Sequence, residues 1–178
     1  MVGLLELVAE LGGEMHAVGT ASAPLHDVQI DSRFVARGDL FAALPGNAVD
    51  GARFVGDALA RGAAAVLSPT RLELAPSVAN WVHPQARRIA GEAAAILHGR
   101  PTRAMFLAAV TGTNGKTTTA HLLGQLLAHV GRRPAVLGTA GNRLADGALL
   151  SASHTTPDAP ELQRLLARHQ RLGGDCVA

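Results

Sequence analysis

The sequence predicts an α/β protein in two parts, and three observations support this fold class. In the second part, strand, loop, helix, strand, helix and strand patterns follow one another, which is typical of a doubly wound, mostly parallel sheet. In the first part, short apolar strands alternate with amphipathic helices, which indicates a smaller α/β domain. A Gly-Arg-Pro-Thr-Arg stretch at 99–103 is the best linker signal between them. We predict domains over 1–84 and 85–178.

The first part should consist of short elements separated by glycines. The segment 2–11 has the apolar spacing of an amphipathic helix, and Gly12 and Gly13 stop it. An Ala-rich helix over 85–98 ends at Gly99. The other predicted elements are strands over 28–30, 40–44, 63–67 and 78–82 and a helix over 52–61.

The second part should be built around a sheet with helices on both faces. Met105–Val110 is a continuous apolar run, as expected of a parallel strand that is covered on both sides. Further strands are predicted over 135–138 and 175–178. The helix between these two should have Thr156 as its N-cap and Pro157 as its first residue. The helix that follows the first strand should face the sheet through an apolar stripe of Leu122, Leu123, Leu126, Leu127 and Val130.

Composition excludes several classes of protein. Hydrophobic residues make up 48% of the chain and charged residues 17%, so a folded protein is expected rather than a disordered one. Aromatic residues are only 3% and the net charge is only +2, which argues against a nucleic-acid partner. The apolar stretches are too short for membrane insertion, and the N-terminus lacks the basic lead of a signal peptide. The single Cys176 excludes an internal disulfide, and we expect a cytoplasmic protein.

A glycine-rich loop before the first helix of the second part is the clearest functional motif. Its sequence at 111–118, Thr-Gly-Thr-Asn-Gly-Lys-Thr-Thr, allows a tight curl in which backbone N–H groups and a helix N-terminus meet phosphate oxygens. The two catalytic candidates are Lys116, for the β- and γ-phosphates of ATP, and Thr117, whose hydroxyl should bind Mg²⁺. The predicted ATP-binding residues are Gly112, Thr113, Asn114, Gly115, Lys116, Thr117 and Thr118.

The use of lysine supports this interpretation of the loop. Lys116 is the only lysine in the chain, whereas the other fifteen basic residues are arginines. A compact ammonium fits among phosphate oxygens where a broad guanidinium does not. The loop departs from the common G-x-x-x-x-G-K-[ST] pattern, because Val110 stands five residues before Gly115. The alternative is a Gly/Thr-rich turn that binds nothing.

Three segments resemble the Mur ligases of the MurE type. The shortened loop at 112–118 is similar to that of the ATP-dependent Mur ligases and of the folylpolyglutamate synthetases. Downstream, Thr155-Thr-Pro-Asp-Ala159 and Leu162-Gln163 are similar to MurE and argue against the related MurF type. The segments that look like the N-terminal domain of MurE and MurF are Asp31-Ser-Arg33, Gly38-Asp-Leu-Phe41, Ala43-Leu-Pro-Gly46, Asp50-Gly51, Phe54 and Gly62-Ala63.

The resemblance implies a small N-terminal domain that holds the uridine nucleotide of a cell-wall precursor, followed by the first part of a phosphate-loop ATPase domain. It implies that Ile30 and Ser32 contact the uracil and ribose, and that 47–49 lines the same pocket. It also places the precursor at Thr155 and Thr156, where a helix N-terminus suits an anion. The implied substrate-binding residues are Ile30, Ser32, Asn47, Ala48, Val49, His154, Thr155 and Thr156.

These residues also have purely structural alternatives. Asp31–Arg33 could be a polar turn, and Thr155–Thr156 could be an ordinary helix start. His154 stands where many relatives have Asn, which makes its role less defined. The other histidines, His121 and His129 among them, lack metal-ligand spacing, so packing or surface roles are expected.

The resemblance implies an ATP- and Mg²⁺-dependent ligase of peptidoglycan synthesis. Its substrates would be the UDP-N-acetylmuramoyl dipeptide ending in D-glutamate, activated as an acyl phosphate, and a diamino acid, meso-diaminopimelate or L-lysine. The family's other Mg²⁺ ligands, its carbamoylated lysine and its C-terminal domain would lie beyond Ala178. We therefore expect a fragment that is inactive alone, with an incomplete second domain. Two alternatives remain: a MurF-type ligase that adds D-alanyl-D-alanine, and a non-ligase phosphate-loop protein with an unrelated first module.

Overall fold

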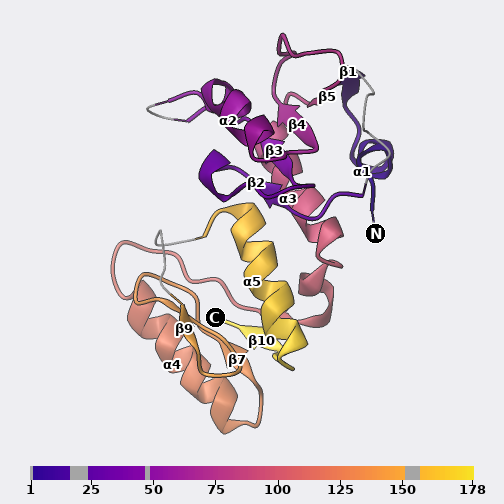
Figure 1. Ribbon diagram of the computed structural model, residues 1–178. Coiled ribbons are helices and arrows are strands. Elements are labelled where there is room, and N and C mark those ends of the chain that lie inside the picture. The colour runs from indigo at the N-terminus through magenta and orange to yellow at the C-terminus, as the bar shows by residue number, and fades with distance from the viewer. Residues whose placement is uncertain (1, 17–23, 47–48, 151–156) are drawn as a thin grey trace. The chain divides into compact units, whose positions relative to one another are not determined.

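The computed structural model describes residues 2–16, 24–46, 49–150 and 157–178, and the chain divides into two compact units after His98. Both units combine helices with mostly parallel strands, which confirms the predicted α/β class (Figure 1). The elements of the first unit are α1 (Leu4–Leu11), β1 (Glu14–His16), β2 (Val28–Gln29), η1 (Ser32–Phe34), β3 (Leu40–Ala42), η2 (Gly51–Phe54), α2 (Val55–Ala60), β4 (Ala65–Ser68), β5 (Ala79–Val82) and α3 (Ala86–Leu97).

The sheet of the first unit has the strand order β1-β5-β4-β3-β2. Strands β2 to β5 run parallel to one another, and β1 pairs antiparallel with β5 at one edge. Because β2, β3, β4 and β5 are parallel, the loops that leave their carboxyl ends all lie at one edge of the sheet. These loops begin at residues 30, 43, 69 and 83.

Helices cover both faces of this sheet because its strands alternate in side-chain direction. In β3, Leu40 belongs to the core cluster that includes α1 and α3, whereas its neighbour Phe41 belongs to the cluster that includes α2. Trp81, the only tryptophan, is fully buried in the first of these clusters, and its indole N–H donates to the Gly12 carbonyl at 2.9 Å. The first unit therefore has a helix–sheet–helix core.

Helix α3 belongs to the first unit, although the predicted boundary at 84/85 placed it in the second domain. Its buried side chains, such as Ile89 and Ala93, pack in the same cluster as Leu4 and Leu40. The division into units instead falls after His98, next to the linker stretch 99–103. An Ala-rich helix does not reveal from its sequence alone which sheet it covers.

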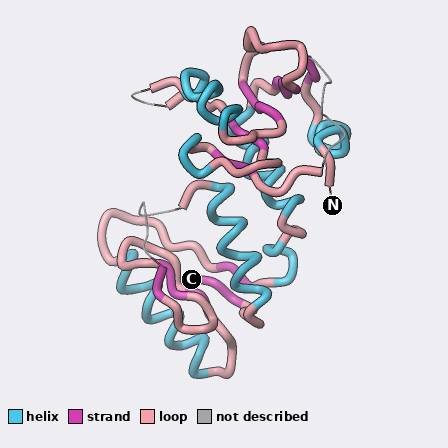
Figure 2. The backbone as a smooth tube through the Cα atoms, viewed as in Figure 1, coloured by secondary structure: helices cyan, strands magenta, loops and turns pink. Residues whose placement is uncertain are grey.

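The second unit contains a small sheet with the strand order β6-β10-β7, in which all strands are parallel. Helix α4 packs against one face of the sheet and α5 against the other. Its strands are two residues long, and long loops as well as helices lie between them in the chain (Figure 2). Its elements are η3 (Pro101–Ala104), β6 (Phe106–Leu107), α4 (Lys116–His129), β7 (Pro134–Ala135), β8 (Asn142–Arg143), β9 (Leu149–Leu150), α5 (Ala159–Arg171) and β10 (Cys176–Val177).

Two predictions about this unit are wrong. The apolar run Met105–Val110 is not a strand covered on both faces: β6 is an edge strand, and Phe106 is 52% exposed. The apolar stripe of α4 does not face the sheet as a whole, since Leu122, Leu126 and Val130 are exposed. The helix instead packs through its small buried residues, Ala120 and Gly124, against Val136, which directly follows β7. Small residues allow a closer approach than leucines would.

The start of α5 also differs from the prediction. Its N-cap is Asp158 and not Thr156, and the proline in its first turn is Pro160 and not Pro157. The Asp158 carboxylate accepts a hydrogen bond from the Glu161 backbone N–H at 2.8 Å. A carboxylate is at least as good an N-cap as a threonine hydroxyl and adds a favourable charge at the helix N-terminus.

A hairpin, β8–β9, follows β7 and was not predicted. Its turn contains Asp146 and Gly147, a pair that is a recognised hairpin signal. Among the residues that the structure describes, no helix is both long and apolar enough to span a membrane.

Candidate functional site

The predicted phosphate loop connects β6 to α4. Gly112 and Gly115 have positive φ values of 147° and 80°, a region that L-amino acids rarely adopt, so these glycines permit the curl of the backbone. The loop from 111 to 115 is exposed to solvent. Helix α4 begins immediately afterwards, at Lys116. The first N–H groups of a helix have no partner within it, so they are available to an anion at this loop.

The side chain of Lys116 lies over this loop. Its Nζ donates to the Gly112 carbonyl at 2.5 Å and to the Thr113 carbonyl at 3.5 Å. The side chain is half-buried, so the ammonium is held near the loop rather than free in solvent. The loop thus combines the N–H groups of a helix N-terminus with a positive charge.

Thr117, the predicted Mg²⁺ ligand, contacts a residue distant in sequence. Its Oγ1 lies 3.1 Å from the Oγ1 of Thr139, which follows β7. Both threonines are exposed. Because β6 and β7 are parallel members of one sheet, the segments that follow them emerge at the same edge. This topology explains how two hydroxyls 22 residues apart meet at the phosphate loop.

These residues fit a nucleotide phosphate that carries a divalent cation. A hydroxyl beside a phosphate-binding loop, together with a lysine, is the donor set that such a complex requires. In the described part of the chain, no cluster of three or more His, Cys, Asp and Glu side chains could hold a metal. The first turn of α4 would hold the phosphates and Thr117 would contact the cation.

In the first unit, the predicted uridine site lies at the carboxyl edge of the sheet. Ile30 and Ser32 follow β2, and the loop that contains Val49 follows β3, which is the parallel neighbour of β2. The two predicted binding loops therefore leave the sheet side by side. Ile30 is half-buried and Val49 is 42% exposed, so both loops present apolar surface there.

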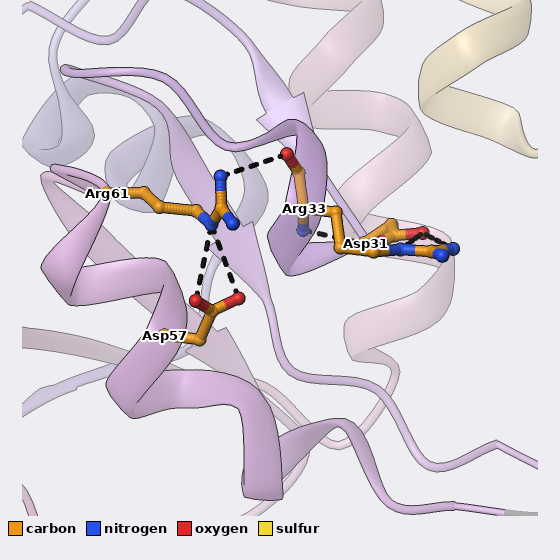
Figure 3. A network of polar contacts seen from close by, with 4 residues as sticks. All are labelled: Asp31, Arg33, Asp57 and Arg61. Carbon is orange, nitrogen blue, oxygen red and sulfur yellow. Dashed lines mark hydrogen bonds and ion pairs between the residues drawn. The ribbon is translucent and has the colours of Figure 1, made fainter.

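A polar network fixes the loop at 31–33 (Figure 3). The Asp31 carboxylate accepts from the Arg33 backbone N–H at 2.9 Å and from the Arg33 guanidinium at 2.6 Å. At the C-cap of α2, Arg61 pairs with Asp57 at 3.2 Å and donates to the Arg33 carbonyl at 3.4 Å. The hydrogen bond from the Arg33 side chain holds the pKa of Asp31 below its usual value.

Ser32 is already engaged within this network. The residue is only 5% exposed. The Ser32 hydroxyl is also the main cause of the lowered pKa of Asp57, ahead of the contribution from Arg61. Ser32 thus has a structural role, and its contact with a ligand stays a prediction.

Part of the Gly38–Phe41 segment has a structural role. The Asp39 side chain is 3% exposed and accepts from the Ala36 backbone N–H at 2.9 Å and from Gln29 at 3.4 Å. Burial raises the pKa of this carboxyl. Leu40 and Phe41 are fully buried.

The other predicted substrate-binding residues lie outside the described part of the chain. They are Asn47, Ala48, His154, Thr155 and Thr156.

Sequence reasoning missed three residues that contact the predicted sites. Thr139 lacks a motif of its own, and only the parallel pairing of β7 with β10 brings it to the phosphate loop. Asp57 and Arg61 have the i, i+4 spacing of a helical ion pair, which was visible in the sequence. The contact of this pair with the loop at 31–33 could not be predicted, because it depends on tertiary structure.

Comparison with known proteins agrees with this arrangement. Residues 24–112 match the family model of the Mur ligase family, catalytic domain, and residues 110–178 match that of the Mur ligase middle domain. The chain belongs to the Mur ligase family. The two matched regions meet at the phosphate loop, so both predicted sites lie within Mur ligase sequence.

Three sequence relatives of this Mur ligase chain carry the name UDP-N-acetylmuramoyl-L-alanyl-D-glutamate–2,6-diaminopimelate ligase, the activity of the MurE type. The protein from Parasynechococcus marenigrum (strain WH8102) is 43% identical, with 97% of this chain and 35% of the relative covered. The protein from Janthinobacterium sp. (strain Marseille) is 38% identical, with 89% and 32% covered. That from Pseudomonas aeruginosa is 40% identical, with 86% and 32% covered. The chain thus spans about a third of the length of these relatives.

Solved structures support the Mur ligase fold. A structure of a UDP-N-acetylmuramoyl-L-alanyl-D-glutamate–2,6-diaminopimelate ligase matches with a TM-score of 0.73 at 32% identity, covering 99% of this chain and 35% of that one. MurF from Acinetobacter baumannii matches with a TM-score of 0.68 at 21% identity, covering 98% and 34%. At this lower identity the MurF likeness concerns the fold alone.

Proposed function

We propose that this chain is the nucleotide-binding part of an ATP-dependent ligase that joins 2,6-diaminopimelate to UDP-N-acetylmuramoyl-L-alanyl-D-glutamate. The observation that carries the proposal is the set of relatives of that name, 38–43% identical over most of this chain. In this proposal the first unit binds the uridine nucleotide of the precursor, and the second unit binds ATP with Mg²⁺.

In the second unit, Lys116 and Thr117 would bind the phosphates of ATP and the cation that accompanies them. ATP supplies the phosphoryl group that activates the D-glutamate carboxylate. The Lys116 ammonium, which lies over the loop, would offset the negative charge of the phosphates, and the N-terminus of α4 would add to this attraction. The Thr117 hydroxyl would contact Mg²⁺. Catalysis of this type depends mainly on positioning and on electrostatic stabilisation.

In the first unit, Ile30, Ser32 and Val49 would hold the uridine end of the precursor. The parallel pairing of β2 with β3 supports this proposal, since it brings the two loops to one edge of the sheet. Asn47 and Ala48 would belong to the same pocket. The precursor's acidic end would lie against His154, Thr155 and Thr156, as the family resemblance implies.

The two alternative functions have less support. A non-ligase phosphate-loop protein would have an unrelated first module, whereas residues 24–112 match a Mur ligase model. A MurF-type ligase shares the fold, but the sequence relatives named above are diaminopimelate ligases.

The nucleotide site can be tested by calorimetric titration of Mg·ADP into the chain and into Lys116→Ala. Because the variant loses a charged hydrogen bond to phosphate, its affinity should fall by about tenfold or more. In a complete enzyme that carries this segment, the same change should cost about 3 kcal/mol or more in transition-state stabilisation. Arg171→Ala, which removes an exposed cation from the last turn of α5, is the matched control and should bind as the wild type does. Equal affinity of Lys116→Ala and wild type would refute the assignment.

A further inference from the structure

The hydroxyl of Thr139 lies beside the phosphate loop but has no role in the proposed function so far described. It lies 3.1 Å from the Thr117 hydroxyl, within hydrogen-bond distance. The backbone around it is fixed: Gly138 and Gly141 close a turn through a 3.0 Å hydrogen bond, and Leu137 donates to the Ala178 carbonyl at 2.9 Å. Thr139 is therefore anchored to the sheet and not carried by the phosphate loop itself.

The chemistry of a metal-bound hydroxyl gives this contact a direction. A threonine hydroxyl has one proton and two lone pairs, and a bound cation takes a lone pair. The hydroxyl then donates its hydrogen bond to another acceptor, and the bound cation strengthens this hydrogen bond by polarising the O–H group. When Thr117 contacts a cation, the pair is therefore aligned with Thr117 as donor and Thr139 as acceptor. The partners that orient metal ligands in this way typically change metal affinity by about 10- to 100-fold when they are lost.

We propose that Thr139 is a positioning residue that accepts a hydrogen bond from the Thr117 hydroxyl and so directs a lone pair of Thr117 toward the nucleotide-bound divalent cation. This inference rests on the proposed function, because it requires nucleotide binding at the phosphate loop. It predicts that Thr139 strengthens only the cation-dependent part of nucleotide affinity. A residue that merely shapes the turn would not distinguish nucleotide with the cation from nucleotide without it.

The test is a set of ADP titrations into the 178-residue chain, each made once with Mg²⁺ and once with EDTA. Thr139→Val keeps the shape and β-branching of the side chain but removes the acceptor. We expect it to lower affinity about tenfold in Mg²⁺ and to leave affinity in EDTA unchanged. Thr139→Ser keeps the hydroxyl and should restore the wild-type response. Thr119→Val, an exposed threonine one turn into α4, is the matched control and should behave as wild type in both conditions.

Each other outcome overturns the inference. An equal loss in Mg²⁺ and EDTA would mean that Thr139 supports the fold or contacts the nucleotide itself. No loss in Mg²⁺, or a Thr139→Ser variant as weak as Thr139→Val, would show that the hydroxyl pair has no role. Failure of the wild-type chain to bind ADP in either condition would instead refute the proposed nucleotide site, and this inference with it. Circular dichroism melting of each variant identifies any that fail to fold.

Discussion

At the scale of single residues, His169 shows how one buried polar side chain joins three segments of the second unit. It projects from α5 and is fully buried. Its Nδ1 accepts from the Ala145 backbone N–H at 3.2 Å, so its Nε2 carries the proton and donates to the Cys176 carbonyl at 3.1 Å. Helix α5, the hairpin turn and β10 are thus joined through one neutral imidazole.

This environment predicts a pH dependence of stability. Burial lowers the pKa of His169 below its ordinary value of 6.5, so the folded state resists protonation that the unfolded chain accepts. The resulting stability is fully present above pH 6.5 and is lost as the pH falls through the lower, folded pKa. Urea unfolding followed by circular dichroism between pH 7.5 and pH 5 should show this loss.

The variant His169→Gln should remove much of this pH dependence. At neutral pH it should also be destabilised by about 1–3 kcal/mol, because the Ala145 N–H and the Cys176 carbonyl lose the imidazole as their hydrogen-bond partner. His129→Gln, at an exposed position on α4, should leave the profile unchanged. If His169→Gln follows the wild-type pH profile, the buried neutral histidine is not its origin.

At the scale of elements, the contact of α4 with Val136, which directly follows β7, depends on a glycine. A Cβ atom at Gly124 would lie 2.4 Å from Cγ2 of Val136, a β-branched side chain that is itself buried. Glycine inside a helix normally costs about 1 kcal/mol relative to alanine. Its presence here is explained by the close approach of the helix to the sheet.

Two identical substitutions should therefore have opposite effects. Gly124→Ala should destabilise the second unit by about 1–3 kcal/mol through overpacking. Gly56→Ala, in α2, meets no atom within 4 Å and should stabilise the first unit by about 0.4–1 kcal/mol. Denaturant titrations measure both changes. A stabilising Gly124→Ala would show that α4 does not approach β7 this closely.

The sequence predicts elements well where the pattern is local. Helix α1 and strand β5 lie within one or two residues of their predicted bounds, because spacing and flanking residues mark them. β1 was not expected, since Glu14–His16 lacks an apolar pattern and forms a strand only by pairing with β5. The face of α4 was mispredicted because leucine spacing shows which residues share a face but not which face meets a sheet.

The same distinction applies to the candidate sites. The phosphate loop was visible because its glycines, Lys116 and Thr117 are consecutive. The contacts of Thr139 with Thr117 and of Arg61 with the Arg33 carbonyl were not visible, because they depend on parallel strand pairing or helix packing rather than on sequence spacing. Short motifs therefore identify a loop, whereas the groups that position it require the tertiary structure.

At the scale of the whole molecule, the two units differ in how well they bury apolar side chains. The first unit fully buries large residues such as Trp81, Phe41 and Ile89. Among the described residues, the smaller second unit exposes six large apolar side chains, Phe106 and Leu126 among them, against four in the first unit. Since buried apolar area provides most of the stabilisation of a fold, the first unit should be the more stable of the two.

The chain contains a native probe for each unit. Trp81 is its only tryptophan, and Cys176, its only cysteine, is buried in the second unit. Burial also raises the pKa of the Cys176 thiol to about 11, so the thiol should react slowly until the unit opens. In a urea series, Cys176 should become reactive at a lower concentration than that at which Trp81 fluorescence changes. Coincident transitions would show that the units unfold as one.

We propose two separate nucleotide sites, one in each unit. The most direct test is calorimetric titration of UDP-N-acetylmuramoyl-L-alanyl-D-glutamate into the chain after saturation with Mg·ADP. We predict binding of one equivalent of the precursor in the presence of bound ADP, since the precursor loops follow β2 and β3 and the phosphate loop follows β6. Competition between the two ligands for a single site, or no binding of the precursor at all, would contradict the account.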